Sequence, residues 1–232
     1  MLMRPDRAVI LAAGLGTRLK WLTRDRPKAL MSVAGEPAIV HTLRHLIRHG
    51  VRHVAINLHA HGEQIRQALG DGRRFGISIR YSVEYELRDS GGGVCQAQQF
   101  LPEGANLFVL NADVVTDIDL TALWQRVSDH PSAAALALIA NPPHHPQGDF
   151  ALVHGKVRPP EMDTLTFSGV SLWPDALLRH QHEPCFPLTD LMHQQMESDQ
   201  LYGIHHHGNW HDIGRPHDLF SLLNCSDCFR FF

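Results

Sequence analysis

An apolar run followed by a glycine-rich turn is the feature that most constrains the fold. Residues 8–13 are all apolar, and Gly14 and Gly16 follow them, before Thr17 and Arg18. A short apolar run bounded by glycine is typical of a strand buried in a parallel sheet. A glycine loop at the end of such a strand lets backbone amides approach phosphate groups closely. This segment predicts an α/β fold with an anion-binding loop at one sheet edge.

Helix and strand patterns alternate along the chain. Apolar spacing predicts helices at residues 36–49, 61–69, 93–101 and 120–127, and strands at residues 51–58, 77–83, 106–111 and 133–139. Later patterns predict a hairpin (150–153 and 156–158), strands at 165–173 and 201–207, and helices at 175–180, 188–196 and 216–223. We expect a single α/β domain over residues 1–232, with a Rossmann-like, doubly wound, mostly parallel mixed sheet flanked by helices.

Composition excludes several partners. Charged residues make up 19% of the chain and the formal net charge is -3, which does not favour nucleic acid or an anionic membrane surface. No run of about 18 apolar residues exists, so we expect no membrane span. The apolar run at residues 8–13 is too short for a signal peptide, and glycines interrupt it. We therefore expect a cytoplasmic protein.

Two cations follow the glycine loop. Arg18 lies within it, and Lys28 comes ten residues later, after Pro27. A dinucleotide fingerprint requires a third glycine where Leu19 stands, so that match is partial. Arginine can hold two phosphate oxygens and lysine supplies a compact charge. This pair favours a triphosphate, although an NAD-dependent oxidoreductase remains an alternative.

Residues 11–37 resemble the N-terminal signature of the sugar-1-phosphate nucleotidyltransferases. The matching residues are Leu11 to Gly14, Gly16 to Leu19, Leu22, Thr23, Pro27, Lys28, Leu30, Val33, Gly35 and Pro37. The resemblance implies that the nucleotide contacts Ala12, Gly14, Gly16, Thr17, Arg18 and Lys28. Arg18 and Lys28 would be catalytic, stabilising the departing pyrophosphate and the transferred phosphate. Trp21 departs from the proline usual in this family.

Two aspartates complete the expected catalytic site. Asn111-Ala112-Asp113 resembles the family's Asn-Gly-Asp metal motif, and Trp210-His211-Asp212-Ile213-Gly214 resembles its late Trp-x-Asp-x-Gly. The resemblance implies that Asp113 and Asp212 bind a shared Mg²⁺, which prefers oxygen ligands. Asn111 would contact the nucleotide. Arg215 stands where threonine is commonest.

Residues 84–93 resemble the loop that contacts base and sugar in this family. Asp89-Ser90-Gly91-Gly92-Gly93 is similar to the acid-Thr-Gly-Gly-Gly of the N-acetylmuramate-1-phosphate uridylyltransferases. The resemblance assigns Glu84 and Gly91 to the nucleotide. Three glycine amides at a helix start would also suit an anion.

Residues 144–150 and 164–171 resemble segments of the same subfamily. They imply that Asp149, Ser168 and Gly169 bind the sugar, so residues to about 140 would bind the nucleotide and residues from about 141 to 223 the sugar. The implied reaction transfers a uridylyl group from UTP to N-acetylmuramate 1-phosphate in peptidoglycan recycling, by a monomer or homodimer. Guanylyl transfer to mannose or heptose 1-phosphate is one alternative, and a non-catalytic sugar-nucleotide-binding domain is another.

Overall fold

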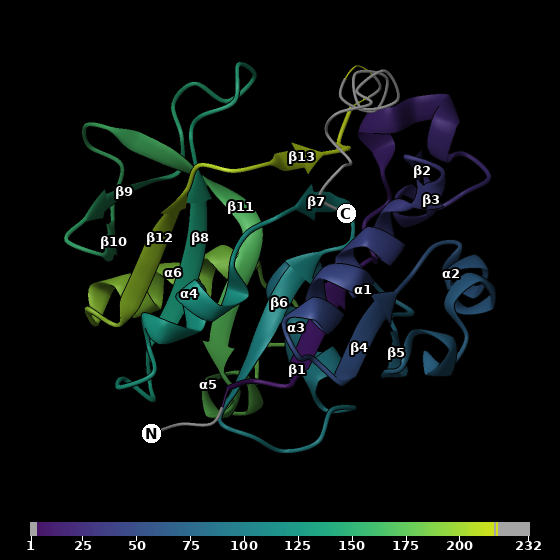
Figure 1. The fold of residues 1–232 in the computed structure, drawn as a ribbon, viewed down its shortest axis with the longest axis horizontal. Helices are drawn as coiled ribbons and strands as arrows, with labels where there is room; N and C mark the ends of the chain where they lie inside the picture. The colour runs from purple at the N-terminus through teal and green to yellow at the C-terminus, as the bar shows by residue number, and fades with distance from the viewer. Residues whose placement is uncertain (1–3, 216, 218–232) are drawn as a thin grey trace.

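One sheet runs through both halves of the chain. The computed structural model describes residues 4–215 and 217, and only the backbone of Arg18, Lys20 and Trp21. Nine strands follow the order β5-β4-β1-β6-β11-β8-β12-β10-β9 (Figure 1). Their bounds are β1 Arg7–Leu11, β4 His53–Leu58, β5 Ser78–Val83, β6 Asn106–Asn111, β8 Ala134–Ile139, β9 Phe150–Val153, β10 Lys156–Arg158, β11 Thr164–Pro174 and β12 Leu201–His206.

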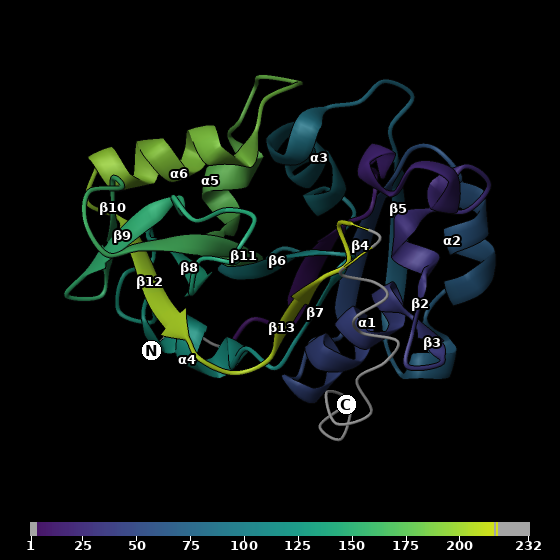
Figure 2. The same ribbon diagram turned by 90° about the horizontal axis from the view of Figure 1, so that it is seen from above.

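Helices cover both faces of this sheet, and alternate strand residues supply the two cores. Ala8 and Ile10 pack with α1, α2 and α4, whereas Val9 packs with α3, α5 and α6 on the opposite face (Figure 2). Strands buried on both faces need apolar residues at nearly every position, which explains the unbroken apolar runs. The helices are α1 Ala38–Arg48, α2 Gly62–Leu69, α3 Asp89–Gln98, α4 Leu120–Gln125, α5 Asp175–Arg179 and α6 Leu188–Glu197.

Strand direction changes in the middle of the sheet. β5, β4, β1 and β6 are parallel neighbours, and β8 is parallel to β12. β11 lies between β6 and β8 and is antiparallel to both. The sheet is therefore mixed, as predicted, and the consecutive long strands β6 and β8 are not neighbours.

An irregularity in β11 lies beside the carboxyl end of β6. Its register with β8 shifts between Phe167 and Ser171, and Gly169 has a φ of 81°. A Cβ atom on Gly169 would lie 2.7 Å from Nδ2 of Asn111. Glycine adopts this left-handed backbone without a steric penalty and leaves room for the Asn111 amide.

Short strands at the sheet edge escaped the sequence prediction. β7 (Val114–Thr116) pairs antiparallel with β13 (Trp210–Asp212), and β2 (Ser32–Val33) pairs with β3 (Glu36–Pro37). Segments of two or three residues show no measurable periodicity. The pairing of β13 with β7 brings a late part of the chain to the end of β6.

Three predicted helix boundaries need comment. The helix expected at residues 93–101 begins four residues earlier, at Asp89, so its three glycines lie inside α3. The helix expected from Glu36 begins at Ala38. The helix expected at residues 216–223 lies outside the described residues.

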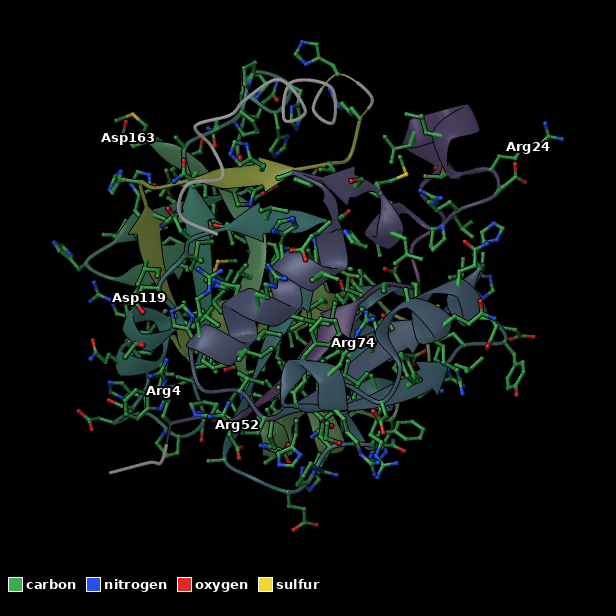
Figure 3. All side chains as sticks on the ribbon, turned by 45° about the vertical axis from the view of Figure 1, so that its right-hand side comes forward. Arg4, Arg24, Arg52, Arg74, Asp119 and Asp163 are labelled. Carbon is green, nitrogen blue, oxygen red and sulfur yellow. The ribbon has the colours of Figure 1, made fainter. Side chains whose placement is uncertain are left out.

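Most charged side chains point outward. Arg24, Arg74, Asp119 and Asp163 extend from the surface (Figure 3). Among the described residues, no helix is long and apolar enough to cross a membrane. Burial of a charge is costly unless the charge is paired, so the buried exceptions carry information. They are Arg7, Glu84 and Asp175.

Candidate active site

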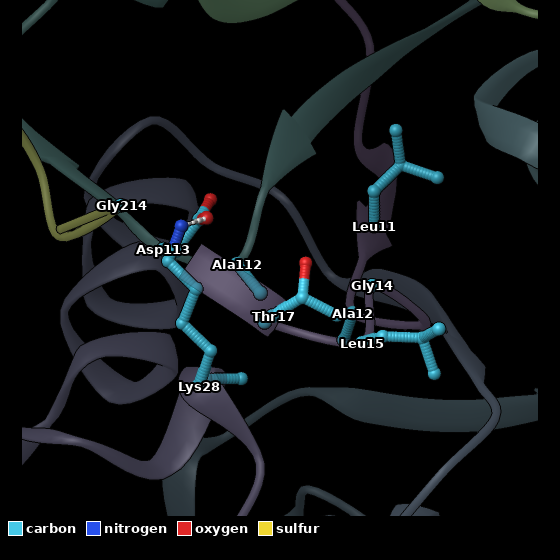
Figure 4. Close-up of a pocket in the computed structure, with 11 residues that line it drawn as sticks. Leu11, Ala12, Gly14, Leu15, Thr17, Lys28, Ala112, Asp113 and Gly214 are labelled. Carbon is cyan, nitrogen blue, oxygen red and sulfur yellow. Dashed lines mark ion pairs between the residues drawn. The ribbon is translucent and has the colours of Figure 1, made fainter. Parts of the chain in front are cut away.

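Three adjoining cavities form a cleft at the carboxyl ends of β1 and β6. The first, of about 250 Å³, is lined by the glycine loop from Leu11 to Thr17 together with Lys28, Asp113 and Gly214 (Figure 4). Ligands of open α/β sheets bind outside the carboxyl ends of the strands. The predicted anion-binding loop therefore lies at the expected edge.

Lys28 joins the two predicted metal ligands. Its ammonium forms ion pairs with Oδ2 of Asp113 and, at 3.4 Å, with Oδ1 of Asp212. Lys28 begins a short 3-10 helix after Pro27, whose extended backbone (ψ 144°) ends the preceding loop. The Lys28 side chain is 12% exposed and each aspartate is 23% exposed, so water screens these charges only in part.

Strand pairing explains how the aspartates meet. Asp113 follows β6, and Asp212 ends β13 opposite Val114. The amide of Ile213 also donates to the carbonyl of Asp113 at 3.1 Å. The two carboxylates therefore converge through backbone pairing, as the sequence predicted for a shared site.

Asp113 and Asp212 fit a divalent metal ion that takes its remaining ligands from water or substrate. Asp113 and Asp212 offer carboxylate oxygens to one cationic position, which the Lys28 ammonium takes here. Among the described residues, no group of three or more His, Cys, Asp or Glu side chains is placed to hold a metal. Mg²⁺ keeps several waters and often binds one or two carboxylates plus substrate phosphates. Phosphate oxygens and water would therefore complete its coordination.

The glycine loop is held from both sides. Gly16 has a φ of 62°, and its carbonyl accepts a hydrogen bond from Oγ1 of Thr23 at 2.9 Å. The amide of Ala12 donates to Oδ1 of Asn57 at 2.7 Å. The backbone of Arg18 belongs to a 3-10 helix, Thr17–Thr23, while its side chain lies outside the described part of the structure.

The second cavity, of about 570 Å³, opens between the glycine loop and the start of α3. It shares Leu11, Gly14, Leu15, Gly16, Thr17 and Asp113 with the first cavity. Its remaining lining is Ala13, Asn57, Glu84, Leu87, Asp89, Ser90, Asn111 and Cys185. The predicted nucleotide residues Gly14, Gly16, Thr17, Glu84 and Asn111 therefore line one space.

The protein already engages both carboxylate oxygens of Glu84. Oε1 accepts from Nδ2 of Asn57 at 2.8 Å, and Oε2 accepts from the amide of Arg88 at 3.1 Å. Because Asn57 also holds Ala12, Glu84 connects the α3 loop to the glycine loop. A base contact by Glu84, as the sequence predicts, would compete with these bonds.

Two of the predicted anion-binding amides have protein partners. The amides of Gly91 and Gly92 donate to the carbonyl of Phe186, at 2.9 Å and 3.2 Å. A Cβ atom on Gly91 would lie 2.3 Å from Cε2 of Phe186, and Gly91 lines none of the three cavities. These glycines let residues 184–186 pack against α3. The anion site expected from three amides is therefore corrected, because packing takes two of them.

The third cavity, of about 260 Å³, lies beyond Asn111, which it shares with the second. Ser168 and Gly169, two of the residues predicted to bind the sugar, line it from β11. Nε1 of Trp210 donates to the carbonyl of Ser168 at 2.8 Å, which ties β13 to this part of β11. The remaining lining is Val114, Pro142, His144, His145, Thr166, Phe167, Asp212 and Arg215.

Asp149 supports this cavity from behind. Its Oδ1 bonds Nε2 of His145 at 2.8 Å, and its Oδ2 accepts from the amide of Phe167 at 2.8 Å. It does not line the cavity, whereas His145 and Phe167 do. The structure therefore shows Asp149 holding two residues of the cavity wall, and its contact with a sugar hydroxyl stays a prediction.

Sequence reasoning assigned no role to Asn57, His145 or Arg215, which line the cleft. Asn57 lies near the end of the predicted strand 51–58, and that carboxyl end was a usable signal. Its bond to Ala12 depends on the register of β1 with β4, where Leu11 is opposite Asn57. That register is not readable from composition.

Half-buried His211 lies beside the second aspartate. Burial lowers the pKa of its imidazole, and Asp117 only partly opposes this effect. This shift favours the uncharged ring next to Asp212.

Known proteins share both the sequence and the fold. The nucleotidyl transferase family model matches residues 7–161. The N-acetylmuramate alpha-1-phosphate uridylyltransferase of Neisseria meningitidis is 39% identical over 90% of this chain and 93% of that protein. The mannose-1-phosphate guanylyltransferase catalytic subunit beta of Danio rerio is 29% identical over 92% of this chain and 62% of its own length.

Solved structures agree on the fold. A candidate glucose-1-phosphate thymidylyltransferase of Bacillus anthracis superposes with a TM-score of 0.82 at 19% identity, covering 93% of each chain. HddC of Yersinia pseudotuberculosis, solved with GMP-PN, gives 0.77 at 19% identity, covering 95% of this chain and 99% of its own. The family match spans more than half of the chain, and the Neisseria relative aligns over nearly all of it. The chain therefore belongs to the nucleotidyl transferase family.

Proposed function

We propose that the chain transfers a uridylyl group from UTP to N-acetylmuramate 1-phosphate, releasing pyrophosphate and serving peptidoglycan recycling. One observation carries this proposal: the Neisseria uridylyltransferase is 39% identical over 93% of its length. The guanylyltransferase of Danio rerio is less similar, at 29% identity.

The three cavities suggest where each substrate would bind along the cleft. UTP would place its base and ribose in the second cavity and its phosphates against the glycine loop and Lys28. The sugar would occupy the third cavity, with its phosphate near Asn111 and Asp212. Residues to about 140 would mainly serve the nucleotide, and residues from about 141 mainly the sugar.

The chemistry asked of the protein is mostly positional. An ionised phosphate oxygen of the sugar attacks the α-phosphorus of UTP in line, so no general base is needed. Lys28, with Arg18 as the second predicted cation, offsets charge on the phosphates. Family members generally depend on a divalent metal. We propose Mg²⁺ held by Asp113 and Asp212, which would supply further neutralisation of the phosphates.

A substrate matrix tests this function. Purified protein with Mg²⁺ receives UTP, GTP or dTTP together with N-acetylmuramate, N-acetylglucosamine or mannose 1-phosphate, and pyrophosphate release is measured. The proposal expects the highest kcat/KM for UTP with N-acetylmuramate 1-phosphate. Turnover with GTP and mannose 1-phosphate alone would favour guanylyl transfer. No turnover in any arm would favour the non-catalytic alternative, and tight NAD binding without triphosphate binding would favour an oxidoreductase.

A further inference from the structure

The third cavity is lined by more basic than acidic side chains. His144, His145 and Arg215 line it, and its acidic residue, Asp212, is paired with Lys28. Asn111 and Asp212, near which the proposed function places the acceptor phosphate, also line this cavity. The lining therefore offers one guanidinium and two imidazoles in addition to the ammonium of Lys28.

Arg215 is available for an anionic ligand. It follows Gly214, is exposed, and forms no ion pair with a carboxylate within the described part of the chain. A guanidinium presents parallel N–H donors that match the two oxygens of a carboxylate. Its place in the cavity wall suits a planar anion carried by the acceptor.

Asp149 fixes the orientation of the His145 ring. One ring nitrogen, Nε2, is 2.8 Å from Oδ1 of Asp149, and the other oxygen of Asp149 is fixed by the amide of Phe167. A carboxylate on one imidazole nitrogen fixes the ring, and between this carboxylate and a second one the ring would carry a proton on each nitrogen and donate to both. Because the anchor is strand β11, the ring holds its position in the cavity wall.

We infer that Arg215, assisted by His145, binds a carboxylate on the acceptor sugar and so determines acceptor specificity. This inference rests on the proposed function. N-acetylmuramate differs from N-acetylglucosamine by a lactyl ether that carries a carboxylate. With the sugar phosphate held near Asn111 and Asp212, the lactyl group is the second anion that the cavity must accommodate. Asp149 is a positioning residue that acts through His145.

The test removes the charge from each partner in turn. Wild type, Arg215→Ala and the control Arg80→Ala are assayed with UTP and three acceptors: N-acetylmuramate 1-phosphate, its lactyl amide, and N-acetylglucosamine 1-phosphate. Arg80 is exposed on β5 and lines none of the three cavities. We expect Arg215→Ala to lose about 100-fold in kcat/KM with the acceptor that carries the carboxylate. With the two acceptors that lack it, the loss should be less than about threefold. Asp149→Asn should give a smaller loss with the same selectivity.

The possible outcomes distinguish failure of this inference from failure of the proposed function. Equal loss by Arg215→Ala on all three acceptors would assign the residue to the shared phosphate or to folding, and would overturn the inference. No loss on any acceptor would also overturn it. If the wild type turns over UTP only with the acceptors that lack the carboxylate, the proposed acceptor itself is wrong.

Discussion

Nζ of Lys28 lies 3.4 Å from Oδ1 of Asp212, although 184 residues separate them in the chain. The same ammonium forms an ion pair with Asp113. It pairs with two carboxylates that would otherwise repel each other. Binding of the proposed Mg²⁺ by these carboxylates would displace the Lys28 ammonium, and this competition can be measured.

Removing the Lys28 charge should strengthen metal binding in the absence of nucleotide. We expect Lys28→Met to be stabilised by 10 mM Mg²⁺ about 1 kcal/mol more than wild type, because no ammonium competes for the carboxylates. Thermal unfolding against Mg²⁺ concentration measures this. Lys28→Met combined with Asp113→Asn should lose the extra stabilisation. An identical Mg²⁺ response of Lys28→Met and wild type would contradict the shared position.

Neutralising one carboxylate should stop turnover but leave the fold intact. We expect Asp113→Asn to lower kcat by about 10²–10³-fold, since charge stabilisation in the transition state is lost. It should also raise the Mg²⁺ concentration needed for half-maximal rate. Asp190→Asn, an exposed change on α6, is the matched control. Turnover of Asp113→Asn within threefold of this control would remove Asp113 from the metal site.

Gly169 should be sensitive for two separable reasons. Gly169→Ala meets both a left-handed backbone, with φ of 81°, and the Asn111 amide at 2.7 Å. Gly155→Ala has a similar φ of 79° but meets only the flexible end of Arg126. We expect about 1 kcal/mol of destabilisation for Gly155→Ala and about 2–4 kcal/mol for Gly169→Ala. Urea unfolding measures both free energies. Equal losses would show that the contact with Asn111 adds nothing to the cost.

Cys185 should report nucleotide binding by its reactivity. It is an exposed thiol in the wall of the second cavity, whereas burial raises the pKa of Cys95 to about 11. In a Cys225→Ser, Cys228→Ser background, maleimide should label Cys185 selectively. UTP with Mg²⁺, at tenfold above its Kd, should slow labelling about tenfold. Protection by GTP but not UTP would favour the guanylyl alternative, and no protection by either would move the nucleotide elsewhere.

Asp175 should make stability depend on acid pH. Its burial would raise the pKa, but hydrogen bonds from Arg179 and Arg7 outweigh burial, and the pKa of Asp175 falls below its usual value. Its stabilisation is therefore complete above the unfolded pKa of about 4 and is lost as pH falls through the folded value. We expect Asp175→Asn to cost about 3 kcal/mol at pH 7, because it leaves Arg7 buried beside a neutral amide.

Urea unfolding of Asp175→Asn and wild type at several pH values checks this. The difference between them should shrink below about pH 4 as the wild-type carboxyl is protonated. Arg158→Ala, which removes an exposed ion pair with Asp199, is the control and should leave stability nearly unchanged, because water screens exposed pairs. A pH-independent cost of Asp175→Asn would show that shape rather than charge is responsible.

Local patterns predicted the parts of the fold that local physics decides. The bounds of β6, β9 and β10 match their expected ranges because long apolar runs and a glycine turn define them. The insertion of β11 between β6 and β8 could not be predicted, since strand order depends on contacts between distant segments. The pairing of β7 with β13 was too short to leave a pattern.

The motifs named residues that the structure brings together in one cleft, but they did not predict the contacts of those residues. Asp113 and Asp212 meet at Lys28 as their motifs implied. Glu84, Gly91 and Asp149 have protein partners that a motif does not reveal, because each bond depends on the three-dimensional path of another segment. Family motifs therefore located the cleft, and only geometry separated the residues that line it from those that support it.

The late position of β13 in the chain has a consequence for protein synthesis. During translation, β1 to β12 leave the ribosome before Asp212 and Arg215 do. The nascent chain therefore lacks the second predicted metal ligand until its last described strand has been synthesised.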